Sequence, residues 1–173
     1  MKPEDRASIL PEPGSSLPLI PYNFLALPQE NSSVDMAKVV LIPVPYDSTT
    51  SFRAGSRDGP DAMIKASYGL EDYDFELEMD VSKIGIHTTG AIESHMAGPF
   101  HMTQRIKDVV SSYVRLGNSV GLLGGEHSIT IGAVQAHVEA HPGLSVLYLD
   151  AHADLRHEYM GTCLLYTSDA ADE

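Results

Sequence analysis

The sequence lacks tryptophan and has a single cysteine, Cys163, in 173 residues. One cysteine excludes an internal disulfide framework and fits a reducing environment. No apolar run approaches the roughly 18 to 20 residues that a membrane-spanning helix needs. The N-terminus, MKPEDRASILPEPGSS, also lacks a hydrophobic signal core. We therefore expect no membrane segment and a cytoplasmic location.

Positive charge is scarce as well. Lysine and arginine total 11 against 24 acidic residues, which gives a formal net charge of -13. Nucleic acid and anionic membranes would be repelled by such a chain, so neither is expected as a partner, whereas a small cationic molecule would be attracted. The hydrophobic content of 43% is that of one compact domain with a sizeable core, or of a piece of a larger one.

Proline density separates an N-terminal arm, residues 1–37, from the rest of the chain. The arm contains Pro3, Pro11, Pro13, Pro18, Pro21 and Pro28. Prolines at this density oppose both helices and central strands, so we expect the arm to lie over the surface. The folded domain is then predicted to span residues 38–162.

Within this domain, short apolar runs alternate with helical patterns. The predicted strands are 38–44, 84–86, 119–123 and 144–149. The predicted helices are 60–70, 99–116 and the stretch from the turn at 124–128 to about His141. The stripe of helix 99–116 consists of Met102, Ile106, Val109, Val110, Tyr113 and Val114, with Gly117 as its C-cap. This alternation predicts an α/β fold with a parallel sheet covered on both faces, a three-layer α/β/α architecture.

Two predicted strands end in residues of metal-ligand type. The first runs into GGEHS at 124–128, which leaves His127 at the start of a helix. The second runs into DAHAD at 150–154, where alternation in an extended segment puts Asp150, His152 and Asp154 on the same side. Because ligand sites in parallel sheets form at the carboxyl ends of strands, these four side chains are expected to converge.

Carboxylate and imidazole without thiolate favour manganese, or another borderline divalent ion, over a structural zinc site. The three groups at alternate positions are too close together to serve one ion without a bridge. A carboxylate of Asp150 shared by two ions solves this, and such a pair of ions can generate a hydroxide nucleophile at neutral pH.

GGEHS and DAHAD, together with VPYDSTTSFRAGSRDGPDAMIKAS at 44–67, resemble the ureohydrolase family of arginases and agmatinases, and PYNFLALP looks most like the agmatinase branch. The resemblance covers roughly residues 18–162. It implies an arginase/deacetylase-like fold and a binuclear Mn²⁺ centre that hydrolyses a guanidinium group to urea and an amine. For agmatine, a small cationic guanidino substrate, the products are putrescine and urea.

Carried over residue by residue, the resemblance implies that His127, Asp150 and Asp154 hold one manganese ion. Asp150 would bridge to a second ion bound by His152, and Asp154 would also pass a proton to the departing amine. Family members form homo-oligomers, as trimers or hexamers. The other interpretations are an arginase or guanidinobutyrase, a member of the deacetylase branch, which the two motifs disfavour, and a metal-binding fragment without catalysis.

Several features of the family pattern have no match here. The family supplies a DxD pair from a later strand and a proton-shuttle histidine beyond Thr162, where this chain reads CLLYT. The tail 163–173 follows no helix or strand pattern and resembles a translated sequencing adaptor. We therefore expect a non-native tail, an incomplete fold, and a fragment that is inactive alone.

Other polar residues keep two interpretations each. Glu126 either favours the helix N-terminus or supports the metal site from behind its ligands. Asp47 and Arg53 either fix the turns of the glycine-rich loop or line the pocket. His157 and Glu158 are expected on a surface turn, and the alternative is that they support the metal site from behind its ligands. The remaining histidines are expected to be surface or structural residues: His87, His95, His101, His137 and His141.

Overall fold

The computed structural model describes residues 19–50 and 53–151. Within them, a parallel sheet has the strand order β4-β1-β5, formed by β1 (Val39–Val44), β4 (Ile86–Thr88) and β5 (Ser119–Gly124). Residue 39 of the central strand pairs with Ile86 on one side and with Ser119 on the other. The carboxyl ends of the strands therefore lie at one edge of the sheet, as the sequence predicts.

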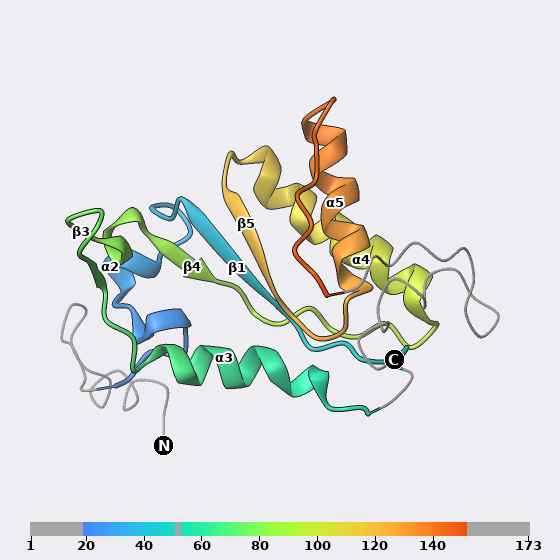
Figure 1. The fold of residues 1–173 in the computed structure, drawn as a ribbon, viewed down its shortest axis with the longest axis horizontal. Helices are drawn as coiled ribbons and strands as arrows, with labels where there is room; N and C mark the ends of the chain where they lie inside the picture. The colour runs from blue at the N-terminus through green and yellow to red at the C-terminus, as the bar shows by residue number, and fades with distance from the viewer. Residues whose placement is uncertain (1–18, 51–52, 152–173) are drawn as a thin grey trace, which may run out of the picture.

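Helices cover the sheet on both sides. Figure 1 shows α3 (Gly59–Ser67) on one side and α4 (Pro99–Arg115) and α5 (Ile129–Ala140) on the other. These helices match the predicted ones to within a few residues. The arrangement confirms the α/β class. The helices that connect the strands pack against the faces of the sheet.

The core lies between β1 and the α4–α5 pair. Val40, Ile42 and Val44 point into it from alternate positions of β1 and are fully buried. The predicted helical stripe meets them: Met102, Ile106, Val110 and Val114 are buried, and Val109 and Tyr113 pack at the margin. Each such aliphatic side chain contributes about 1.5–3 kcal/mol on burial, so the packing of this layer stabilises the fold.

The expected C-cap of the long helix is confirmed. Gly117 adopts a left-handed φ of 85° just beyond α4, and its N–H donates to the Val114 carbonyl at 3.0 Å. Asn118 N–H donates back to the Tyr113 carbonyl at 3.2 Å, which closes the last turn. Glycine accommodates this backbone conformation without the steric cost that a side chain would add.

The strand expected at 84–86 begins later than predicted. Val81–Ile84 forms the short helix η3, and Gly85 has a left-handed φ of 79° that separates it from β4. A Cβ at Gly85 would also lie 2.8 Å from the Met36 carbonyl oxygen. The glycine therefore marks the close passage of the arm rather than the middle of a strand.

The strand predicted over 144–149 is wrong for this structure. The segment has no strand assignment and runs beside α5 (Figure 1), and its apolar side chains are exposed. An apolar run signals only that a segment can be buried in a sheet, whereas a strand also needs a neighbour that pairs with its backbone.

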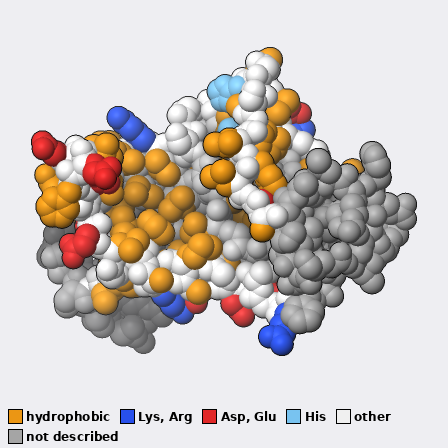
Figure 2. All heavy atoms as spheres, viewed as in Figure 1, with side chains coloured by type: hydrophobic (Ala, Val, Ile, Leu, Met, Phe, Trp, Pro, Cys, Tyr) orange, Lys and Arg blue, Asp and Glu red, His pale blue; other side chains and the backbone are white. Residues whose placement is uncertain are grey.

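The rest of the described chain forms short elements. They are η1 (Phe24–Ala26), α2 (Gln29–Ser32), η2 (Ser56–Asp58) and an antiparallel hairpin of β2 (Tyr73–Asp74) and β3 (Met79–Asp80). Hydrophobic side chains gather on the viewed face between α3 and the strands β4 and β1 (Figure 2). None of the helices in the described ranges is both long and apolar enough to cross a bilayer.

Candidate metal site

The turn after β5 is pressed against the end of β1. A Cβ at Gly125 would lie 2.2 Å from the carbonyl oxygen of Tyr46 and 2.7 Å from that of Val44. Contacts this short with backbone atoms leave room only for glycine. The second glycine of GGEHS is thus required by close approach between two neighbouring strand ends.

Backbone hydrogen bonds fix this turn in place. Glu126 N–H donates to the Tyr46 carbonyl at 2.8 Å, and α5 starts at Ile129. His127 therefore stands between a strand end and a helix start, at the carboxyl edge of the sheet. This is the location that the sequence predicts for a ligand.

His127 and Asp150 come together at this edge. The His127 Nδ1 lies 3.6 Å from the Asp150 Oδ2, and the two side chains are 26% and 28% exposed. The two residues approach from consecutive segments, one after β5 and one after the run that follows α5. The predicted convergence is therefore present for the two metal-ligand candidates that the structure describes.

Tyr148 also contacts His127. Its ring stacks on the imidazole with centroids 5.4 Å apart and planes 6° from parallel. Its hydroxyl lies 3.4 Å from the His127 Nδ1. The tyrosine therefore restricts the rotation of the imidazole and lies next to the nitrogen that faces Asp150.

Sequence reasoning missed Tyr148 although a signal was present. In an extended segment, alternate residues share a side, so Tyr148 lies on the same side as Asp150. The alternation that places the predicted ligands of DAHAD on one side therefore also includes Tyr148, two residues before Asp150.

The other candidates fall outside the described residues. His152 and Asp154, the remaining predicted ligands, belong to this group, as do His157, Glu158 and Cys163. Among residues 19–50 and 53–151, no three histidine, cysteine or acidic side chains are grouped so that they could hold an ion. The described part of the site is thus a pair of donors.

The donor chemistry of this pair fits a divalent cation such as manganese. An imidazole nitrogen and a carboxylate oxygen face each other at a separation beyond hydrogen-bond length. Both are partly exposed, so an ion can reach them. Mixed nitrogen and oxygen donors without sulfur suit manganese and similar ions better than a structural zinc site.

The loop that follows β1 is fixed from within by Asp47. Its carboxylate is buried, accepts the Gly55 N–H at 2.8 Å and the Arg57 N–H at 3.3 Å, and forms an ion pair with the Arg57 guanidinium. The guanidinium beside it lowers the pKa of Asp47 from its ordinary value, and the Gly55 N–H acts in the same direction. Of its two interpretations, the structure supports the one in which Asp47 fixes the turns.

The histidines without ligand spacing have structural contacts. His87 Nδ1 lies 2.8 Å from the Ser32 carbonyl oxygen, and His137 Nδ1 lies 2.8 Å from that of Ala133. His95 stacks on His101 with centroids 4.9 Å apart. Burial is the main reason that the pKa of His95 is lowered, and Arg105 acts in the same direction. These contacts agree with the roles expected from the sequence.

Known proteins share both the sequence and the fold. The chain matches the arginase family over residues 37–168. N(1)-aminopropylagmatine ureohydrolase from Thermus thermophilus is 38% identical over 145 residues, which cover 83% of this chain and 49% of that protein. The crystal structure of agmatine ureohydrolase from Thermoplasma volcanium matches with a TM-score of 0.71 and 30% identity, over 95% of this chain and 50% of that one.

A third relative was solved with metal. The structure of Trypanosoma cruzi formiminoglutamase with Mn²⁺ matches with a TM-score of 0.67 and 25% identity, over 78% of this chain and 46% of that one. The chain spans about half the length of the curated relatives that it matches. Because the family match covers most of its residues, the chain belongs to the arginase family.

Proposed function

We propose that this chain supplies one part of a manganese-dependent ureohydrolase of the agmatinase type. The observation that carries the proposal is the approach of His127 Nδ1 to Asp150 Oδ2 at the carboxyl edge of the parallel sheet. The related ureohydrolases, and the family member solved with Mn²⁺, support the same chemistry. The reaction is hydrolysis of the amidine carbon–nitrogen bond of a guanidinium group.

Four residues of this chain would hold the metal. His127, Asp150 and Asp154 would bind one ion, and Asp150 would be shared with a second ion on His152. When bound, a pair of such ions supplies a water-derived nucleophile at neutral pH. A new carbon–oxygen bond then replaces the carbon–nitrogen bond to the alkylamine, giving urea and the free amine.

The side chains of the protein would orient the ligands and move the proton. Tyr148 stacks on His127 and so keeps the imidazole nitrogen directed at Asp150. The Asp154 carboxylate would accept a proton from the attacking water and deliver it to the departing amine nitrogen. The formal charge of -13 favours the approach of a cationic substrate over long distances.

The proposed substrate is agmatine, a small cation with one guanidinium and one amine. N(1)-aminopropylagmatine is a second candidate, because a relative with 38% identity is named for that activity. Arginine and guanidinobutyrate remain alternatives, since both carry the same reacting group. A metal-binding role without catalysis is the alternative from another class. The enzyme is further proposed to act as a homo-oligomer.

The test is urea release in the presence of Mn²⁺ from each of these four guanidino compounds. It should be measured on the protein encoded by the complete open reading frame of the source DNA and on the 173-residue chain. We expect the complete product to release urea fastest from agmatine. The 173-residue chain should release none, because its four proposed donors are fewer than two ions require. Absence of urea from all four compounds with the complete product would reject the proposal.

Substitution separates the metal site from general charge effects. Asp150→Ala should abolish both Mn²⁺ binding, measured by calorimetry, and urea release. Asp108→Ala removes the same charge from the exposed surface of α4 and should leave both unchanged. Equal losses in the two variants would contradict the assignment of Asp150 as a ligand.

A further inference from the structure

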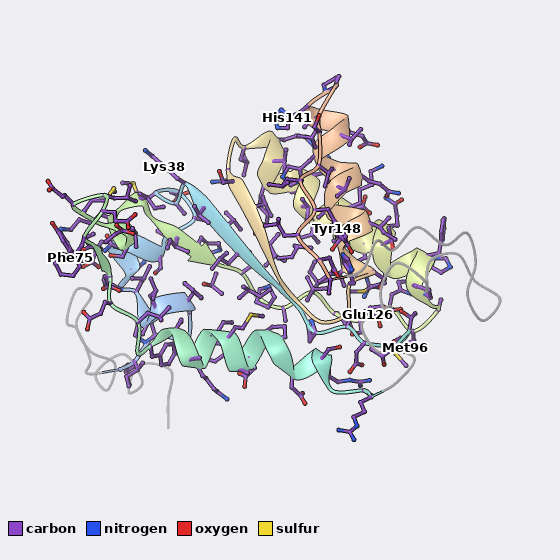
Figure 3. The ribbon with its side chains drawn as sticks, in the orientation of Figure 1. Lys38, Phe75, Met96, Glu126, His141 and Tyr148 are labelled. Carbon is purple, nitrogen blue, oxygen red and sulfur yellow. The ribbon has the colours of Figure 1, made fainter. Side chains whose placement is uncertain are left out.

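The turn that carries His127 contains a buried carboxylate. Glu126 is 3% exposed, and Figure 3 shows it at the carboxyl end of β5, with Tyr148 on the segment beside α5. Burying a carboxylate is costly unless its oxygens are hydrogen-bonded. Its partners therefore indicate what it does.

Both oxygens of Glu126 bind the loop that follows β1. Oε2 accepts the Thr49 N–H at 2.7 Å, and Oε1 accepts the hydroxyl of the same threonine. Oε1 also accepts the hydroxyl of Ser128. Thr49 and Ser128 are themselves buried, so this network lies inside the protein. Three donors on one carboxylate satisfy most of its acceptor capacity.

These bonds connect the turn to a loop that has its own internal hydrogen bonds. Asp47, two residues before Thr49, is buried and binds both Gly55 and Arg57 further along the same loop. The Tyr46 carbonyl accepts the Glu126 N–H at 2.8 Å. The turn is thus attached to this loop through its backbone and through its side chain.

The residues on either side of His127 take part in this network, since Glu126 and Ser128 bind each other across it. We propose that Glu126 is a positioning residue, whose buried carboxylate ties Thr49 to the turn and so sets the orientation of His127. This inference rests on the proposed function only where it treats His127 as a metal ligand. Glu126 itself is not a ligand in this proposal, because binding an ion would require it to give up these three hydrogen bonds.

Two substitutions at this position separate geometry from charge. In Glu126→Gln, the amide oxygen can still accept the Thr49 N–H, and the amide NH₂ can donate to the hydroxyl oxygens of Thr49 and Ser128. Glu126→Ala removes the connection altogether. We expect Glu126→Ala to lower the Mn²⁺ affinity of the 173-residue chain by about 10–100-fold, the usual effect of losing a residue that supports a ligand. Glu126→Gln should stay close to the wild type.

A second measurement needs no metal. The ¹⁵N and ¹H resonances of the His127 imidazole, and hydrogen exchange at the Thr49 amide, report the orientation of the turn directly. We expect Glu126→Ala to shift the imidazole signals and to accelerate exchange at Thr49, and Glu126→Gln to change both much less. Glu139→Ala, on the exposed end of α5, removes the same charge and is the matched control.

The outcomes are distinguishable. Unchanged imidazole signals in a folded Glu126→Ala would overturn the proposal, as would equal effects of Glu126→Gln and Glu126→Ala. If the wild-type chain binds no Mn²⁺, the metal-binding role of the chain fails, while the imidazole signals still decide the role of Glu126. If Glu126→Ala does not fold, the same measurement is made on Thr49→Val and Thr49→Ser. Thr49→Val, which lacks the hydroxyl, should shift the imidazole signals. Thr49→Ser, which keeps a hydroxyl, should give signals close to those of the wild type.

Discussion

In the loop after β1, the charge of the Asp47 carboxylate contributes to the stability of the fold. The pKa of Asp47 is lowered in the folded protein, chiefly by the Arg57 guanidinium. A lowered pKa means that the ionised carboxylate stabilises the fold above its unfolded pKa of about 3.9, and that this contribution is lost as the pH falls through the folded pKa.

Asp47→Asn should therefore destabilise the protein in a pH-dependent way. We expect a loss of about 1.5–3 kcal/mol near pH 7, the usual size for hydrogen bonds to a charged group. The difference from the wild type should start to shrink below about pH 4 and should vanish as the pH falls through the lowered pKa of the folded protein, where the wild-type carboxylate also becomes neutral. Urea unfolding at several pH values measures it. Asp61→Asn, in an exposed ion pair, is the control and should change less. A pH-independent difference would contradict this account.

Gly125→Ala tests the contact between the two strand ends. The added methyl group would lie 2.2 Å from the Tyr46 carbonyl oxygen, so the backbone must move. We expect a destabilisation of at least about 1–3 kcal/mol, as for other overpacked sites. Gly90→Ala is the matched control, because a Cβ there has no neighbour within 4 Å. Equal unfolding midpoints for the two variants would show that the turn can relax.

The sequence predicts which side chains meet at the site only where residues of ligand type directly follow an apolar run. His127 and Asp150 meet as expected because each follows an apolar run that ends at the same edge. Glu126 kept two interpretations because its partner, Thr49, is 77 positions away in the sequence. A hydrogen bond between two loops leaves no local periodicity from which it could be predicted.

At the scale of elements, the crossing of α4 and α5 depends on Gly132. A Cβ there would lie 2.5 Å from the Thr103 carbonyl oxygen and 2.9 Å from the Ile106 Cβ. Alanine favours a helix by about 1 kcal/mol over glycine, which opposes the cost of the clash. We expect the clash to dominate and Gly132→Ala to destabilise the protein by about 1–3 kcal/mol.

Thermal unfolding followed by circular dichroism measures this balance. Ser112→Ala, on the exposed side of α4, improves helix propensity without crowding and should be neutral or slightly stabilising. A stabilised Gly132→Ala would mean that the two helices separate at little cost, which would contradict the close packing at their crossing.

Helices could be predicted where periodic apolar residues form one face that packs on the core. Helix 99–116 follows from its stripe because Met102, Ile106 and Val110 pack on β1 and α5. The run at 144–149 has the composition of a buried strand, yet lies exposed beside α5. The apolar composition of a segment shows that it can be buried. Whether it forms a strand depends on whether its backbone finds a neighbouring strand to pair with.

At the scale of the whole molecule, the alternation of strands and helices was enough to predict the parallel sheet and its layers. The order β4-β1-β5 was not predictable, because it depends on how the crossover helices are placed. The division of the chain at residues 37 and 162 stays a prediction.

Among the described strands, β5 lies at an edge of the sheet, and the segment that follows α5 has exposed apolar side chains. Leu147 is 85% exposed there. An edge strand and exposed apolar side chains both favour association with other chains. The net charge of -13 opposes it, and salt screens this repulsion over distances of about 10 Å at 0.1 M. We therefore expect the 173-residue chain to self-associate more strongly as ionic strength rises.

Leu147→Lys should reduce this self-association, measured by analytical ultracentrifugation over a range of salt concentrations. Phe75→Lys is the matched control, because Phe75 is 87% exposed and lies in the β2–β3 hairpin, away from that edge. Both variants change the net charge equally, so a difference between them reports position rather than charge. Equal reductions would show that association depends on total charge and exposed apolar area, and that the β5 edge has no special role.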